Sequence, residues 1–366
     1  MTNVTRLLSI GALLSMTACA STQIKRDLYT AELVAQKIDS LRRAERIPGL
    51  AVAMLQDTTV LLARGFGLAN IERNVPVTAE TPFNTASVSK TISGALAMRL
   101  VEQGTLDLDR PMRSYQNFNE FCDAARGDGG VFFSDYACAT DKLTMRHVLG
   151  MSANGTEPGT RFLYNPPSFS WASRPMAEAT GVPFSELVDS LILKPAGMRN
   201  AARTHRRLPL PPRIASELAT PYHLDVAGNV VQSDPPPPQG DGAAGGVIAS
   251  VMDLARFDIA LMSNRLISAK SREAMWTGIT TPSGAQLPYG LGWFLGRYNN
   301  RRVVWHTGLW DGQYSALYLK VLSDVPSERY TLVLLANSES LRWPTKLDEA
   351  AIERSPFARA FLDTFK

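Results

Sequence analysis

Apolar and polar positions follow two different periods along this chain, and each period predicts a different kind of element. Residues 28–47 carry apolar side chains at helical spacing among charged ones, which predicts an amphipathic helix. Residues 50–55 and 60–63 are apolar runs on either side of a polar turn, and they predict two strands. Residues 88–102 are apolar on most sides, so we expect a helix buried in the core, ended by Gly104.

The middle of the chain differs from both of its ends. Residues 105–240 predict helices separated by loops rich in Pro and Gly, with the helices at 144–151, 171–180 and 184–193. The last third predicts a helix ending at residue 262, strands at 292–296, 303–305, 314–321 and 330–336, and a helical segment at 345–364.

Strands therefore lie at both ends and helices lie between them. This pattern predicts an α/β fold whose sheet domain is assembled from residues 28–104 and 241–366, with a helical domain inserted at residues 105–240. A groove between two such domains is a usual place for an active site.

The N-terminus has the pattern of an export signal. An apolar run over residues 7–18 ends at Cys19 and is too short to cross a bilayer as a helix, but it suits a signal peptide. The Met-Thr-Ala-Cys ending resembles a bacterial lipobox, which implies cleavage before Cys19 and lipidation of that residue. We predict a signal peptide at 1–18, a tether at 19–27, and a lipid-anchored protein of the bacterial cell envelope facing the periplasm. The alternative is an ordinary secretory signal with an incidental cysteine.

The two remaining cysteines, Cys122 and Cys138, are predicted to form a disulfide, because export implies an oxidising compartment. Such a bridge contributes about 3 kcal/mol in the chain-entropy account. Two free buried thiols are the alternative. Two isolated cysteines lack the paired spacing of a zinc site, so no metal is expected.

Composition and charge narrow the classes of function. The chain has 366 residues, of which 45% are hydrophobic, enough to bury a large core. Its formal net charge of +4 is spread along the chain without a block of Lys or Arg, so we expect no nucleic-acid partner.

Ser87 and Lys90 form the first candidate for chemistry. A Ser-x-x-Lys pair is common by chance, but this one opens the helix that we expect to be buried. Lys90 would lie one turn from Ser87 on the same face. Burial disfavours the charged ammonium, so Lys90 would become a base able to activate the serine. The alternative is a solvated lysine beside a capping serine.

Several segments, in one order along the chain, resemble class C β-lactamases, serine penicillin-binding proteins and the esterases related to them. The resemblance implies an antiparallel sheet flanked by helices with an inserted all-helical domain. The segments lie at 48–53, 83–90, 106–109, 143–149, 245–250 and 289–293.

A second catalytic element comes from this resemblance. The family has a Tyr-x-Asn triplet where this chain has Tyr164-Asn165-Pro166. The resemblance implies that Tyr164 works with Lys90 to carry the proton of Ser87 to the leaving group. Tyr164 taken alone would more simply be a core aromatic. Pro166 replaces an Asn that helps to hold the lysine and a substrate amide, and Asn165 is the candidate to take its place.

The third element is His306-Thr307-Gly308, which is similar to the family's Lys-Thr-Gly motif in its His variant. The resemblance implies that the backbone N–H of Leu309 pairs with that of Ser87 as an oxyanion hole. His306 replaces a permanent cation with a titratable group, which weakens carboxylate recognition at neutral pH. A packing histidine is the alternative.

Together these elements predict a serine hydrolase that forms an acyl-enzyme on Ser87 and needs no cofactor. Its partner would be a small acyl substrate, and a carboxylesterase, amidase or D-peptidase activity is favoured because the motif Asn and Lys are both replaced. The alternatives are a β-lactamase and a non-catalytic envelope binding protein on the same fold.

Overall fold

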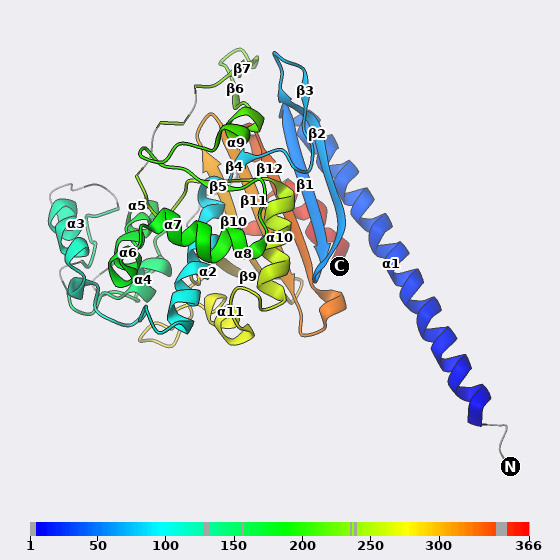
Figure 1. Cartoon of the computed structure of the whole chain (residues 1–366), viewed down its shortest axis with the longest axis horizontal. Helices are drawn as coiled ribbons and strands as arrows, with labels where there is room; N and C mark the ends of the chain where they lie inside the picture. The colour runs from blue at the N-terminus through cyan, green and yellow to red at the C-terminus, as the bar shows by residue number, and fades with distance from the viewer. Residues whose placement is uncertain are drawn as a thin grey trace.

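The computed structural model describes residues 5–126, 130, 132–138, 140–155, 157–234, 236–237, 240–341 and 350–365, with side chains from residue 25 onward except at 124–126. Figure 1 shows a central sheet covered by helices, with a mainly helical region beside it.

An antiparallel sheet of seven strands forms the centre of the molecule, in the order β3-β2-β1-β12-β11-β10-β9. β1 pairs with β12, so that Leu50 lies opposite Ala336, and this pairing joins the two ends of the chain. The sheet assembled from both ends is therefore confirmed. Its strands are β1 (Gly49–Gln56), β2 (Thr59–Asn70), β3 (Val75–Pro76), β9 (Phe294–Tyr298), β10 (Arg301–Trp310), β11 (Tyr314–Leu322) and β12 (Tyr330–Ala336).

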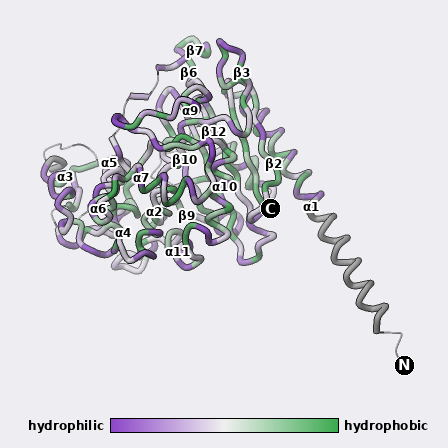
Figure 2. The backbone as a smooth tube through the Cα atoms, viewed as in Figure 1, coloured by the Kyte–Doolittle hydropathy of each residue, from purple (hydrophilic) through white to green (hydrophobic). Residues whose placement is uncertain are grey.

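Helices cover both faces of this sheet. Figure 1 shows α2 and α10 on one face and α1 with α12 on the other. These helices are α1 (Thr5–Ala44), α2 (Ser89–Glu102), α10 (Val251–Met262) and α12 (Pro356–Leu362), and α11 (Ala269–Met275) packs on α2. Hydrophobic residues gather in the centre, over the strands and the helices packed on them (Figure 2).

α2 has the central position that its apolar surface predicts. Almost all of its side chains are buried, and Gly104 follows its end with a φ of 71°, a backbone conformation that glycine adopts without strain. A short 3₁₀ turn, η1 (Ala86–Val88), leads into the helix. This turn places Ser87 at the surface end of a buried helix.

The segment between residues 105 and 240 contains helices close to those predicted at 144–151, 171–180 and 184–193, and it also contains short strands that we did not predict. β5 joins β8 and β4 in a three-stranded sheet, and β6 pairs with β7. The division into domains at these boundaries stays a prediction. The helices are α3 (Gln116–Arg126), α4 (Met145–Leu149), α5 (Pro166–Ser170), α6 (Ser173–Thr180), α7 (Phe184–Val188), α8 (Lys194–Ala196) and α9 (Pro212–Glu217). The short strands of this segment are β5 (Ala202–Arg203), β6 (Tyr222–Leu224) and β7 (Val230–Gln232), and those on either side of it are β4 (Phe83–Asn84) and β8 (Val247–Ala249).

The predicted disulfide joins Cys122 to Cys138, whose Cα atoms lie 5.6 Å apart. It lies beside a cluster of aromatic rings in which Phe121 stacks on Trp171 at 4.0 Å between ring centroids. The bridge therefore ties α3 to the segment that packs under α5.

The two termini leave some predictions open. The side chain of Cys19 and residues 342–349 lie outside the described parts, so lipidation and the signal peptide stay predictions. A helical segment was expected at 345–364. Among the described residues of this range, the α-helix α12 covers only Pro356–Leu362. In the part of the chain that the structure describes, no helix has both the length and the apolarity needed to cross a membrane.

Candidate active site

Ser87 lies in a tight turn between a strand and the buried helix. The N–H of Ala86 donates to the side chain of Asn84 at 2.9 Å, and the hydroxyl of Thr85 donates to the carbonyl of Val247 at 2.9 Å. Ala86 has a φ of 46°, which is unusual for a residue with a side chain and marks a strained backbone. These contacts hold Ser87 half-buried at the mouth of a cavity.

Lys90 is buried and lies directly against this serine. Its Nζ is 2.7 Å from Ser87 Oγ and donates to the carbonyl of Ala244 at 2.9 Å. The side chain is 0% exposed, and burial lowers the pKa of Lys90 to about 7. The hydroxyl of Ser87 and the carbonyl of Ala244 are both neutral. These hydrogen-bond partners therefore include no carboxylate that would stabilise the charged ammonium and raise the pKa of Lys90 again. The predicted base and nucleophile are therefore in contact.

Tyr164 comes from the segment before α5 and packs against the same lysine. Lys90 Nζ lies 5.3 Å from the centre of the Tyr164 ring. Burial raises the pKa of Tyr164, while a hydrogen bond with the side chain of Ser87 opposes that shift. The phenol therefore stays protonated at neutral pH. The structure brings Ser87, Lys90 and Tyr164 together as the sequence predicts.

β10 forms another wall of the site. Thr307 and Leu309 line the cavity, whereas Gly308 faces the turn that carries Ser87. A Cβ on Gly308 would lie 2.4 Å from the carbonyl oxygen of Thr85. Only glycine lets the strand approach the turn so closely.

His306 lies behind the cavity and is fully buried. Its Nδ1–H donates to the carbonyl of Thr307 at 2.5 Å, and its Nε2 therefore accepts from the hydroxyl of Tyr289 at 2.8 Å. Burial, and next the nearby Lys90, hold the pKa of His306 well below its usual value. His306 is thus a neutral packing residue at pH 7 in this structure and presents no cation to a substrate.

Asn165 does not take the place of the missing motif asparagine. Its side-chain oxygen accepts from the N–H of Ser168 at 3.0 Å and caps α5. Its amide donates to Asn154 at 2.9 Å and to the carbonyl of Phe132 at 2.8 Å. The expected contact with Lys90 is therefore wrong, because the helix start and the neighbouring loop use the whole amide group.

Some residues that shape the site escaped the sequence analysis. Ala244 accepts a hydrogen bond from Lys90 through its backbone carbonyl. Every residue type has this carbonyl, so the sequence could not predict the contact. Arg203 is buried beneath this segment, where its guanidinium donates to the carbonyls of Gly242 and Gly245. A Cβ on Gly246 would collide with that guanidinium. The Gly245-Gly246 pair was therefore the one feature of the sequence that pointed to a buried group packed closely against this segment.

The cavity beside Ser87 has a volume of about 540 Å³. Pro166 and Pro167 line one side, and Leu309 and Trp310 line another, so much of its wall is apolar. Among the described residues, no three His, Cys, Asp or Glu side chains lie close enough together to hold a metal ion. The arrangement offers a serine, an adjacent amine with a lowered pKa and a phenol, which together can transfer an acyl group.

Known proteins share both the sequence pattern and the fold. The sequence model of the family described as Beta-lactamase matches residues 34–354. Penicillin-binding protein 4* of Bacillus subtilis (strain 168) is 28% identical over 309 residues, which cover 76% of this chain and 66% of that protein. A D-aminopeptidase of Gluconobacter oxydans (strain 621H) is 26% identical over 310 residues, 80% of this chain and 56% of that protein. The chain thus spans just under two thirds of the first relative and a smaller share of the second.

The fold agrees with a solved structure as well. An octameric penicillin-binding protein homologue from Pyrococcus abyssi superposes with a TM-score of 0.71 at 22% identity. The match covers 90% of this chain and 77% of that one.

Proposed function

The chain belongs to the beta-lactamase family, and from this premise we propose that it is a serine hydrolase that forms an acyl-enzyme on Ser87. The observation that carries the proposal is the 2.7 Å contact between Ser87 Oγ and the buried Lys90 Nζ. With a pKa of about 7, roughly half of the lysines hold a neutral amine at pH 7. A neutral amine at this distance can accept the serine proton.

The acylation step follows from these positions. Lys90 takes the hydroxyl proton while Ser87 Oγ forms a bond to the acyl carbon. The negative charge that develops on the acyl oxygen would be stabilised by the N–H groups of Ser87 and Leu309. Ser87 lies in the first turn of a helical segment, where N–H groups lack helical partners, and Leu309 lines the same cavity.

Collapse of this intermediate breaks the bond to the leaving group. The leaving group needs a proton, and we assign its delivery to the Tyr164 hydroxyl, which is re-protonated by the Lys90 ammonium. Water then attacks the ester carbon while the neutral Lys90 amine accepts a proton from it. The bond from the acyl carbon to Ser87 Oγ breaks, Lys90 returns the proton to Oγ, and the acid product leaves.

The substrate is proposed to be an ester, an amide or a peptide of D-amino acids. Two observations support this preference over a β-lactam. Pro166 offers no side-chain amide at the place of the motif asparagine, and Asn165 is occupied elsewhere. His306 is neutral and lies outside the cavity lining, so no cation at this position meets the carboxylate of a β-lactam.

β-Lactam hydrolysis is the second candidate, because the Ser87, Lys90 and Tyr164 set is complete and the family carries that name. A comparison of nitrocefin with short nitrophenyl esters on the purified protein separates the two. Turnover of nitrocefin faster by orders of magnitude would reverse the ranking. A non-catalytic binding role would be indicated if neither a fluorophosphonate nor a fluorescent penicillin labelled Ser87.

The test of the hydrolase itself is intact-mass detection of an acyl adduct after incubation with nitrophenyl acetate. The adduct should map to Ser87 and disappear in Ser87→Ala together with turnover. Ser263→Ala is the matched control, because Ser263 is exposed at the end of α10, where its hydroxyl donates to the carbonyl of Ile259 and accepts from Arg265. Undiminished turnover by Ser87→Ala would overturn the assignment.

We also propose that the protein is exported and anchored by lipid on Cys19, on the basis of the apolar run and the lipobox-like residues before it. Metabolic labelling with an alkyne fatty acid should mark the protein and should fail in Cys19→Ala. Equal labelling of the two proteins would contradict the anchor.

A further inference from the structure

A second cavity, larger than the first, opens beside the proposed catalytic one. It has a volume of about 780 Å³. Ser170, Gly240 and Gly242 line both cavities, so the two lie side by side. A substrate long enough to pass these three residues would therefore reach from Ser87 into the second cavity.

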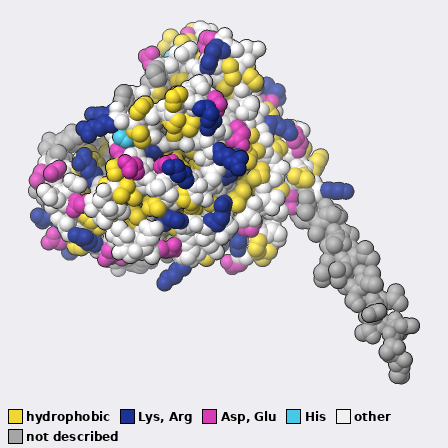
Figure 3. All heavy atoms as spheres, in the orientation of Figure 1, with side chains coloured by type: hydrophobic (Ala, Val, Ile, Leu, Met, Phe, Trp, Pro, Cys, Tyr) yellow, Lys and Arg dark blue, Asp and Glu magenta, His cyan; other side chains and the backbone are white. Residues whose placement is uncertain are grey.

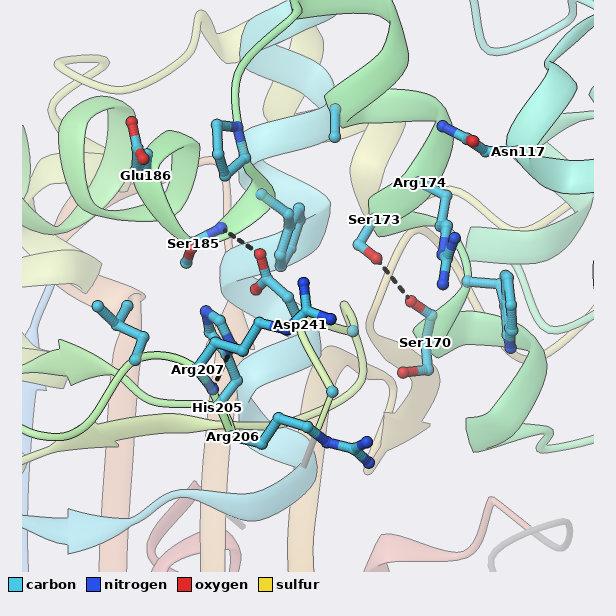
Figure 4. A pocket seen from close by; sticks show the side chains of 17 residues that line it. Asn117, Ser170, Ser173, Arg174, Ser185, Glu186, His205, Arg206, Arg207 and Asp241 are labelled. Carbon is cyan, nitrogen blue, oxygen red and sulfur yellow. Dashed lines mark hydrogen bonds between the residues drawn. The ribbon is translucent and has the colours of Figure 1, made fainter. Parts of the chain in front are cut away.

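Three arginines surround this second cavity. Figure 4 shows Arg206 and Arg207 on one side and Arg174 on the other. Figure 3 shows acidic and basic side chains interspersed over the visible face of the molecule. Three arginines around one cavity therefore make its surroundings more positive than the rest of that face. Among the described residues, no carboxylate pairs with any of the three guanidinium groups.

The acidic groups at this cavity do not cancel that charge. Asp241 forms an ion pair with the buried Arg203 at 3.5 Å and accepts from the N–H of Ser185 at 3.0 Å. Its charge is thus matched by Arg203, which does not line the cavity. Glu186 is the other carboxylate in the lining and is exposed. Three cations therefore face the cavity against one uncompensated carboxylate.

Local structure fixes the backbone of two of these arginines and the side chain of the third. Arg206 and Arg207 are exposed and occupy a turn closed by two backbone hydrogen bonds between His205 and Leu208, of 2.9 and 3.2 Å. The guanidinium of Arg174, also exposed, lies 4.5 Å from the ring of Trp171 in a cation–π contact. Guanidinium groups bind carboxylate or phosphate through paired hydrogen bonds.

We propose that this cavity is a subsite for an oxyanion, a carboxylate or a phosphate, carried by the substrate at a distance from the bond that Ser87 attacks. The inference rests on the proposed function and deepens it. The walls contributed by Trp171, Phe184 and Leu208 are apolar, so the part of the substrate between the reacting carbonyl and the oxyanion is a hydrocarbon or similarly apolar chain. The preferred substrates are thus acyl compounds with an apolar spacer and an acidic end.

The first test uses pairs of nitrophenyl esters of equal chain length, one ending in a methyl group and one in a carboxylate, from succinate to suberate half-esters. The carboxylate should raise kcat/KM by about 5-fold or more at the chain length that reaches the arginines, with the gain shrinking in high salt. The gain should disappear in the double variant Arg206→Gln with Arg207→Gln. Arg73→Gln is the matched control, because Arg73 is exposed in the turn between β2 and β3.

An ester of the best chain length that ends in a phosphate shows which oxyanion the subsite prefers. A larger gain in kcat/KM with the phosphate assigns a phosphate, and a larger gain with the carboxylate assigns a carboxylate.

Equal kcat/KM for methyl and acidic esters at every length would overturn the subsite while leaving the hydrolase intact. A gain that survives in the double variant would overturn it as well.

Binding to the Ser87→Ala protein provides a readout that needs no turnover. Calorimetric titration should show suberate binding at least about 5-fold more tightly than octanoate, and the difference should vanish in the arginine double variant. This result is expected even if Ser87 proves not to be catalytic, so the two failures are distinguishable. Equal affinity for the two ligands would overturn the subsite.

Discussion

Two of the lysines that the structure describes are buried, and they have opposite surroundings. Lys90 is 0% exposed and Lys320 is 2% exposed, and burial lowers the pKa of both. Lys320 lies in an ion pair with the fully buried Asp258 and donates to Thr331 at 2.9 Å. Lys90 has neutral partners, namely the hydroxyl of Ser87, the carbonyl of Ala244 and the rings of Tyr164 and Phe169.

The difference lies in the counter-charge rather than in burial. In the Lys320 cluster the carboxylate opposes the effect of burial and keeps an ammonium in place, and the Tyr318 hydroxyl also donates to Asp258, at 2.5 Å. At Lys90 no carboxylate offsets the lost hydration, so burial favours the neutral amine. The same side chain is therefore a structural cation in one region and, in the function we propose, a base in the other.

The largest expected effect comes from removing the amine at the site. Lys90→Met should lower kcat/KM for a nitrophenyl ester by about 10³-fold or more, because no other base contacts Ser87 in the described structure. Its free energy of unfolding at pH 7 should stay within about 1 kcal/mol of the parent or rise, because a buried unpaired amine is removed.

Lys270→Met is the control for that experiment, because Lys270 is exposed on α11. It should keep the parent kcat/KM. A Lys90→Met protein that is folded by circular dichroism and retains a tenth of the activity would refute the role of the lysine.

Breaking the other pair should cost stability instead. Asp258→Asn leaves Lys320 buried without its carboxylate, and the free energy of unfolding should fall by about 3–5 kcal/mol. The change turns Lys320 into a lysine of the Lys90 kind and lowers its pKa further. The folded protein then binds fewer protons than the unfolded chain, so the loss should be larger at pH 6 than at pH 9. Urea unfolding at the two pH values measures it.

A stability loss that does not depend on pH would show that the cost of Asp258→Asn comes from packing rather than from the charge on Lys320. An unchanged free energy of unfolding would show that the ion pair contributes nothing.

The proton relay should contribute less than the base. Tyr164→Phe keeps the ring that packs on Lys90 and removes the hydroxyl, so kcat/KM should fall by about 10²-fold. The fall should shrink for esters with good leaving groups, which need no proton, and a series of substituted phenyl esters measures this trend. A fall of equal size across the series would contradict delivery of the proton by Tyr164.

The smallest effect is expected when the charged cluster is replaced as a whole. Lys320→Met combined with Asp258→Leu removes both charges, and such replacements are often neutral or stabilising, within about 1–4 kcal/mol. Thermal unfolding of the double variant and of Asp258→Asn should therefore differ clearly. A double variant as unstable as Asp258→Asn would show that the buried hydroxyls of Tyr318 and Thr331 require their hydrogen bonds to Asp258 and Lys320 for stability.

The sequence predicted the parts of the site that depend on residue type and period. The helix that buries Lys90 follows from its apolar surface, and Tyr164 and Gly308 follow from their motifs. It did not predict Ala244, whose contribution is a carbonyl, or the use of Asn165 as a helix cap. It also missed the cluster of Lys320 and Asp258, because a pair separated along the chain leaves no local pattern.

The fold shows the same limit. The long strands β10 to β12 have clear apolar runs and were predicted, while two-residue strands such as β4 and β5 exist only through their pairing with β8. Non-local pairing of such short segments leaves no period to detect. The position of Ser87 depends on this small sheet, since β4 leads directly into its turn.

The most direct test of the central claim is the titration of the two lysines in one sample. Protein labelled with ¹³C at lysine Cε is followed by NMR between pH 5 and 11, with Lys90→Met and Lys320→Met to assign the two signals. We expect Lys90 to lose its proton near pH 7, well before Lys320. A Lys90 signal that titrates near the ordinary lysine value of about 10.4, or after Lys320, would contradict it.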